Sequence, residues 1–188
     1  MDIGSHGEAP FAADITADEI AKAAGSTIEA VRALTESGPA AKLMTTGAMK
    51  VAKDLYGANK FQGVISVGGG TGTGVASAVM RELPIGLPKL MLVSQKIVQA
   101  GIRNYVGTKD ILIMPSVADI AGLNSLTTDA LSKAVGAIIG MMEIAETEVS
   151  KKPLVFMTMT GLSTGCGLRV QSSLEDNGFE VAVFHAIG

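Results

Sequence analysis

Short apolar runs alternate with amphipathic stretches along most of the chain. The runs 61–67, 89–93 and 111–114 are rich in Val, Ile, Leu and Met, which predicts buried strands. The stretches 75–83 and 125–144 carry apolar residues at helical spacing, which predicts helices. Continuous apolar strands that alternate with helices are typical of a parallel sheet covered on both faces. The pattern therefore predicts an α/β protein with a Rossmann-like three-layer fold and a mainly parallel sheet.

The segment before the first predicted strand is expected to be helical. Thr16–Glu19 has the pattern of a capping box, and the helix that it opens stops at Gly25. A second box, Ser26–Glu29, opens a helix that ends near Gly38. A longer helix is predicted at 39–56, because its apolar residues recur at roughly helical spacing.

A polar, charged stretch near residue 150 is the best candidate for a linker. It covers Glu146–Lys152, and Pro153 follows it. We therefore divide the chain into a Rossmann-like first domain, 1–149, and the opening unit of a second α/β domain, 153–188. A single β-α-β unit cannot build its own core, so it either joins the first sheet or begins a second domain. Its predicted elements are a strand at 154–159, a helix at 168–177 and a strand at 180–185.

Composition excludes several classes of protein. The chain is 47% hydrophobic and 18% charged, which indicates a globular core rather than disorder. Its net charge is −3 and it shows no basic stripe, so nucleic acid is not an expected partner. The single cysteine, Cys166, fits a reducing compartment, so we expect a cytoplasmic protein. No apolar run reaches the ~18 residues of a membrane span, and residues 1–6 lack the features of a signal peptide, so no membrane contact is expected.

The clearest chemical signal is a glycine-rich run between a predicted strand and a predicted helix. Glycine lets the backbone approach a ligand closely and adopt positive φ, and a helix N-terminus offers free N–H groups and the positive end of a dipole. Together these features predict an anion site, for a phosphate first, at the carboxyl edge of the sheet, where the threonine hydroxyls add donors. The alternative is a tight turn that needs small residues for packing. The run reads Gly68, Gly69, Gly70, Thr71, Gly72, Thr73 and Gly74.

This run does not match the two best-known phosphate-binding patterns. No Lys-Ser or Lys-Thr pair follows it, as a P-loop requires. The nearest match to the dinucleotide fingerprint, Gly72-x-Gly74-x-x-Ser77, carries Ser at the third place. The region about twenty positions on, 90–94, contains no acidic residue for a ribose. A nicotinamide-dependent enzyme is therefore disfavoured.

Three further loops follow predicted strands. The long loop after the second strand holds Arg103, which suits a phosphate, and Tyr105, which suits stacking on a base; the alternative is an ordered surface loop. The loop after the third strand holds Asp119 and Asn124, which either line the same crevice or cap the next helix. The loop 160–167 carries glycines and the lone cysteine and is a second candidate anion loop. No spacing among His, Cys, Asp and Glu indicates a zinc site.

Four segments occur in an order that resembles one family. They read GVISVGGG at 63–70, MRELPIGLPK at 80–89, YVGTKDI at 105–111 and SVADIAGLN at 116–124. The chain is similar in these segments to the tomato mosaic virus resistance protein-like, ATP-binding family. The resemblance implies two α/β domains in sequence, the first Rossmann-like, and ATP as the ligand. In the family that the chain resembles, the plant member holds a viral replication protein and so blocks viral RNA replication.

The resemblance carries further implications for the site and the boundaries of the chain. It implies that 68–74 is the nucleotide-side loop and that the two domains meet near 151–153. Family chains begin earlier, with a strand and a helix, so an exposed sheet edge or a partner chain is expected in place of that strand. Family chains also continue past His185, so we expect this chain to be a fragment of a longer protein or a truncated gene product. The segments 69–73 and 95–101 depart from the usual family sequence.

Three functions remain open on the sequence. The first is a binding or regulatory module for a nucleotide or a small phosphorylated ligand, with ATP, with or without Mg²⁺, as the ligand and a homodimer or higher homo-oligomer as the assembly. The second is an enzyme acting on a small phosphorylated or carboxylated metabolite in the inter-domain crevice, motivated by Arg103, Asp110, Asp119 and Asn124 at strand ends. The third is a protein-interaction module whose glycine run is structural, in which a bulky residue at Gly70 disrupts folding.

Overall fold

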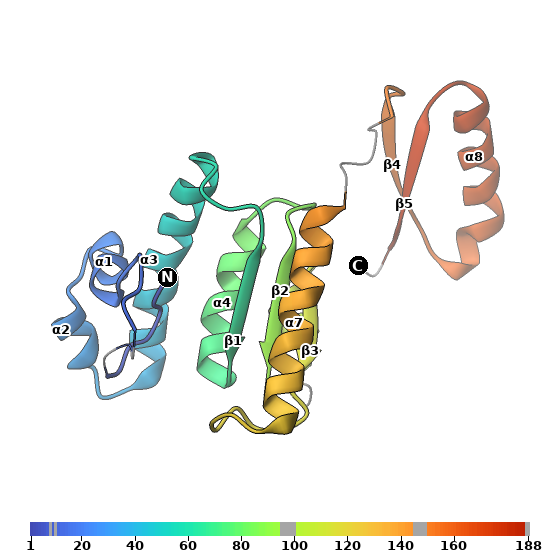
Figure 1. Ribbon diagram of the computed structural model, residues 1–188. Helices are drawn as coiled ribbons and strands as arrows, with labels where there is room; N and C mark the ends of the chain where they lie inside the picture. Colours follow the sequence, from blue (N-terminus) through green and yellow to red (C-terminus); the bar gives the residue numbers. More distant parts are fainter. Residues whose placement is uncertain (8, 10, 95–100, 145–149, 187–188) are drawn as a thin grey trace. The chain divides into compact units, whose positions relative to one another are not determined.

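The computed structural model describes residues 1–7, 9, 11–94, 101–144 and 150–186 (Figure 1). The chain splits into two compact units, Met1–Ile144 and Ala145–Gly188, and each is described by itself. Residues 146–149 of the predicted linker lie outside the described residues. The elements of the first unit are α1 (Ala17–Ala23), α2 (Ile28–Arg32), α3 (Ser37–Gly57), β1 (Val64–Gly68), α4 (Gly70–Glu82), β2 (Lys89–Val93), α6 (Arg103–Val106), β3 (Leu112–Pro115) and α7 (Ser125–Glu143).

A parallel three-stranded sheet forms the centre of the first unit. Its strand order is β1-β2-β3, and in the register Val64 lies opposite Lys89 while Leu90 lies opposite Leu112. Helices α4 and α7 flank this sheet (Figure 1). The predicted α/β fold with a mainly parallel sheet is therefore confirmed.

Strand β2 is the core of this sheet because it is buried along its whole length. Successive side chains of a strand point to opposite faces. Accordingly, Leu90 and Leu92 pack with the buried face of α7, whereas Met91 and Val93 pack with α4 and the residues of α6. This alternation places one helical layer on each face, which is the three-layer arrangement that the continuous apolar run predicts.

The N-terminal helices form a second hydrophobic cluster on the α3 side of α4. Helix α3 crosses α1 very closely, because a Cβ added at Gly47 would lie 1.9 Å from the carbonyl oxygen of Ile20. Pro39 lies inside the first turn of α3, where a missing N–H costs no helical hydrogen bond, so the helix begins two residues earlier than predicted.

Helix α2 is shorter than the sequence predicts, and its start differs. The predicted cap, Ser26, instead closes the end of α1, because its N–H donates to the carbonyl of Ala21 at 2.9 Å. Gly25, with φ of 78°, supplies the left-handed residue that this Schellman-type ending needs. Thr27 then takes over as the N-cap and accepts a hydrogen bond from the Ala30 N–H.

Strand β1 is an outer strand of the described sheet. Its pairing partner is β2, and no other described strand pairs with it. Ile65 and Val67, on the face shared with α7, are 40% and 43% exposed. An exposed sheet edge is one of the two arrangements that the resemblance implies for this position.

The second unit contains a β-α-β arrangement with its own sheet. Strands β4 and β5 pair in parallel with each other, so among the described residues they do not join the first sheet. Gly167 lets α8 pack closely on β4, since a Cβ there would lie 2.8 Å from the Met159 sulfur. On the strands, the rings of Phe156 and Phe184 lie 5.7 Å apart and both are largely exposed. Its elements are β4 (Leu154–Met159), η1 (Gly161–Ser163), α8 (Thr164–Asp176) and β5 (Glu180–His185).

Candidate functional site at the carboxyl edge of the sheet

The carboxyl ends of all three parallel strands meet at one edge of the first unit. Beyond β2, the N–H of Ser94 donates to the carbonyl of Gly68 at 3.3 Å, and the N–H of Ser116 donates to the carbonyl of Val93 at 2.8 Å. From this edge, α4 runs back along one face of the sheet and α7 along the other. Ligands of open α/β sheets usually bind outside the carboxyl ends of the strands, so this edge is the first place to look for a site.

Helix α4 begins at this edge without a side-chain cap. Gly69 is its N-cap residue and provides no side-chain hydrogen bond, whereas Thr16 and Asn124 cap α1 and α7. The N–H of Thr73 donates to the carbonyl of Gly69 at 2.9 Å, so it lies within the helical ladder. The three preceding N–H groups have no acceptor among the described residues, and the positive end of the helix dipole reinforces them. They belong to Gly70, Thr71 and Gly72.

The glycines of the run are not explained by the fold of the described residues. We expected positive φ angles, but no glycine between 68 and 74 has one, because the run forms the strand end and the first turn of α4. A Cβ at Gly70, Gly72 or Gly74 would meet no described atom within 4 Å. Each glycine inside a helix costs about 1 kcal/mol relative to Ala. The described fold would therefore accept larger residues here and would gain stability from them.

The two threonines of the run have different environments. Thr71 is exposed at the start of α4. Thr73 is fully buried, and its hydroxyl donates to the carbonyl of Gly68 at 3.3 Å. The Thr73 hydroxyl thus joins strand to helix, which leaves Thr71 as the threonine of the pair that is open to a ligand.

The residues predicted on the second loop lie along α6. Tyr105 is half-buried and packs on the cluster between α4 and the sheet, so its ring takes part in the core. Its carbonyl accepts a hydrogen bond of 2.6 Å from Arg81, which holds α6 against the last turn of α4. Arg103 is exposed at the start of α6. The segment 95–100, which also belongs to this loop, lies outside the described residues.

The loop after β3 contains a strained turn and a helix cap. Val117 has φ of 66°, and the N–H of Ala118 donates to the carbonyl of Ser116 at 2.7 Å, which is a γ-turn of the rare type. Asp119 accepts a hydrogen bond from the next backbone N–H at 2.9 Å. Asn124 accepts from two N–H groups of α7 at 3.0 Å each, so it takes the capping role. Sequence reasoning missed the strained turn, for which a β-branched residue gives no signal.

The four polar residues of the enzyme hypothesis are not brought together. Asp110 precedes β3, whereas Asp119 and Asn124 follow it, so they lie at opposite edges of the sheet. Asp110 instead forms an ion pair of 2.8 Å with Lys89, whose side chain is fully buried at the start of β2. Burial acts to raise the pKa of Asp110, but hydrogen bonds from the Lys89 amine and the Gly86 N–H outweigh it and hold that pKa below its ordinary value. The sequence contained one indication of this ion pair: Lys89 is a charged residue at the start of an apolar strand, where it needs a partner.

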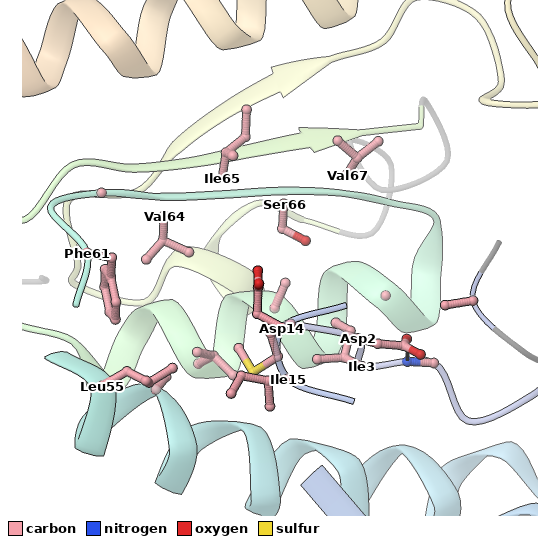
Figure 2. Close-up of a pocket in the computed structure, with 18 of the residues that line it drawn as sticks. Asp2, Ile3, Asp14, Ile15, Leu55, Phe61, Val64, Ile65, Ser66 and Val67 are labelled. Atoms are coloured by element: carbon pink, nitrogen blue, oxygen red, sulfur yellow. Dashed lines mark hydrogen bonds between the residues drawn. The ribbon is translucent and has the colours of Figure 1, made fainter. Parts of the chain in front are cut away.

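A cavity of about 990 Å³ lies along the outer side of β1, between α3, α4 and the N-terminal segment (Figure 2). Figure 2 shows Val64 and Ser66 on one face of β1 and Ile65 and Val67 on the other. Gly72, from the first turn of α4, also lines this cavity. The cavity was not predicted, because it depends on how α3 packs beyond the sheet.

The remaining predictions concern the loop 160–167, metal sites and membrane spans. In the loop 160–167, Thr160 and Ser163 form a cap for η1, and Cys166 is exposed on α8. Within the residues that the structure describes, no group of three or more His, Cys, Asp or Glu side chains is placed to hold a metal ion. None of the described helices combines the length and apolar character needed to cross a membrane.

Comparison with known proteins shows the family. The N-terminal domain model of the uncharacterised protein family UPF0261 matches residues 1–147, and the C-terminal domain model matches residues 152–188. A UPF0261 protein of Clostridium tetani is 39% identical over 189 residues, which is 100% of this chain and 46% of that protein. One of Mesorhizobium japonicum is 34% identical over 188 residues, again 100% of this chain and 46% of that protein.

A plant protein is also similar. The ToMV resistance protein Tm-1(GCR237) of Solanum lycopersicum is 39% identical over 133 residues, which is 67% of this chain and 17% of that protein. The chain spans less than half the length of the bacterial relatives that it matches. On the extent of these matches, the chain belongs to the UPF0261 family.

Proposed function

We propose that this chain binds a phosphate-bearing small molecule at the first turn of α4, that the molecule is a nucleotide, and that the nucleotide is ATP. One observation carries the proposal. Three free N–H groups and a row of open glycines stand together at the carboxyl edge of a parallel sheet, and the described fold gives no internal reason for the glycines. Their small size has a purpose if a ligand approaches the backbone there.

The chemistry of the edge suits phosphate oxygens. The N–H groups of Gly70, Thr71 and Gly72 point from the positive end of the α4 dipole, and the exposed Thr71 hydroxyl adds a donor. The first turn of α4 carries no acidic residue that would repel an anion. It also carries no Lys or Arg, so we propose that Mg²⁺ accompanies ATP and offsets part of its charge.

The proposed setting is a cytoplasmic homodimer or higher homo-oligomer of a longer protein. The lone cysteine supports a reducing compartment. The unpaired outer edge of β1 supports an assembly, because exposed strand edges and apolar residues beside them are surfaces for association.

The proposal is tested by isothermal titration calorimetry with ATP, ADP and AMP, each with and without Mg²⁺. The wild-type chain is expected to give saturable heat, and Gly70→Val is expected to lose it. A Cβ at Gly70 meets no described atom within 4 Å, so we expect the variant to keep its fold while its side chain fills space near the free N–H groups. Gly136→Val on α7 is the matched control, because that helical glycine is equally open and lies away from the loop.

A folded wild-type chain that gives no heat with any of the three nucleotides overturns the proposal. If the wild type and Gly70→Val bind a nucleotide equally well, the nucleotide does not bind at the first turn of α4. If the glycine run were purely structural, a bulky residue at Gly70 was expected to disrupt folding. A Cβ at Gly70 has no described neighbour within 4 Å, so we no longer expect that disruption. We propose no reaction, since Asp110 and Asp119 lie at opposite ends of β3.

A further inference from the structure

One buried polar side chain stands apart from the others. Five of the six buried polar residues in the described part of the chain use their side chains in hydrogen bonds to backbone carbonyls: Thr73, Ser77, Lys89, Ser116 and Thr127. The sixth, Ser94, is 8% exposed, and its hydroxyl has no hydrogen-bond partner among the described residues. The described protein therefore leaves the hydrogen-bonding capacity of this hydroxyl unused.

The free part of Ser94 is the hydroxyl oxygen itself. Every fully enclosed side-chain oxygen or nitrogen in the described structure has a partner, so the unpaired Ser94 oxygen is not fully enclosed by the described residues. The rest of the side chain is enclosed at the end of β2. Ser94 is therefore held in place by its surroundings and presents one donor to the exterior.

Ser94 lies beside the first residue of the glycine run. Val93 pairs with Gly68 in the sheet register, so the next residues, Ser94 and Gly69, are neighbours on adjacent strands. A Cβ added at Gly69 would lie 3.9 Å from the Ser94 Oγ. The hydroxyl is thus next to Gly69, the N-cap of α4, and the free N–H groups belong to the three residues that follow Gly69.

We propose that Ser94 is a ligand-binding residue that donates a hydrogen bond from β2 to the phosphate group held by the first turn of α4. This inference rests on the proposed function and extends it from α4 to the neighbouring strand. The amides of α4 approach the phosphate from the helix side, and the hydroxyl approaches it from the neighbouring strand. A neutral donor adds a directed hydrogen bond without adding charge, so the site recognises a phosphate ester by several fixed donors rather than by a lysine.

The experiment compares Ser94→Ala with wild type by calorimetric titration against ATP, pyrophosphate and inorganic phosphate. Losing one hydrogen bond to a charged group weakens binding about 10- to 100-fold. Ser94→Thr keeps the hydroxyl and is expected to bind more tightly than Ser94→Ala. Ser77→Ala is the matched control, because Ser77 is equally buried but donates to the Gly74 carbonyl, and its affinity is expected to equal that of wild type. Circular dichroism and thermal melting confirm that each variant is folded.

The outcomes separate this inference from the proposed function. Binding that Gly70→Val abolishes and Ser94→Ala weakens supports both. Binding that Gly70→Val abolishes and a folded Ser94→Ala leaves unchanged overturns the role of Ser94 and leaves the α4 site standing. Absence of wild-type binding to every phosphate compound overturns both. Weakening of ATP alone, with pyrophosphate and phosphate unaffected, also overturns the inference, because the hydroxyl would then act on another part of the nucleotide.

Discussion

Lys89→Met probes the amino edge of the sheet, opposite the proposed ligand site. The Lys89 amine is buried and donates to three oxygens at 2.8 Å, those of the Pro84 and Leu87 carbonyls and the Asp110 carboxylate. These bonds tie the loop before β2 to the start of β3. Methionine keeps the apolar stem of the side chain and removes the charge and all three donors.

The expected loss follows from those contacts. Hydrogen bonds to charged groups contribute about 1.5–3 kcal/mol each, and breaking a buried ion pair costs about 3–5 kcal/mol. Asp110 is 40% exposed and can recover some hydration, which reduces the cost. We therefore expect a loss of about 2–4 kcal/mol, a large share of the roughly 5–15 kcal/mol that stabilises a domain.

The assay is urea unfolding followed by circular dichroism, with the free energy of unfolding taken from the midpoint and slope. Lys133→Met is the matched control, because the Lys133–Asp129 pair on α7 is exposed and spaced four residues apart. Such pairs contribute about 0.3–0.5 kcal/mol. The reasoning is refuted if the two Lys→Met variants lose the same small amount, since burial would then have no effect on the value of the pair.

Three further predictions concern stability. Gly47→Ala should lose about 1–3 kcal/mol in the same urea assay, because its Cβ would lie 1.9 Å from the Ile20 carbonyl oxygen; an unchanged midpoint would contradict the close crossing of α1 and α3. Gly136→Ala should gain about 1 kcal/mol, since the helical position is open, and a lowered melting temperature would count against this. Because the folded pKa of Asp110 is lowered, its contribution is fully present above the ordinary value of 3.8 and is lost as pH falls through the folded pKa. The stability difference between wild type and Asp110→Asn should therefore shrink in acid below pH 3.8, and a difference that grows there would reverse the sign of the argument.

The sequence predicted the sheet well because its strands are continuous apolar runs. The run 89–93 coincides with β2, and the long helix at 125–144 differs from α7 by one residue. Strand β1 begins at Val64 rather than residue 61, and Gly63 lies just before it. These elements were predictable because burial on both faces leaves an unmistakable pattern in the side chains.

The candidate site was less predictable, because its parts meet only in three dimensions. The glycine run was recognisable, but its lack of positive φ and the open space around Gly70 required coordinates. Ser94 is an ordinary residue in the sequence, and its significance depends on burial and on the absence of a partner among the described residues. Asp110 and Asp119 both stand near a strand, yet only the direction of β3 shows that they belong to different edges.

The two ends of β2 have consequences for how this family can diversify. Lys89 is the first residue of β2, and Ser94 follows its last residue. The buried strand therefore separates the contacts of the Lys89 amine from the Ser94 hydroxyl. Substitutions at exposed positions beyond the carboxyl ends, such as Thr71, then leave the Lys89 contacts intact. A library randomised at the exposed residues Gly70 and Thr71 would vary the proposed ligand site while the Lys89 contacts at the other end of β2 stay unchanged.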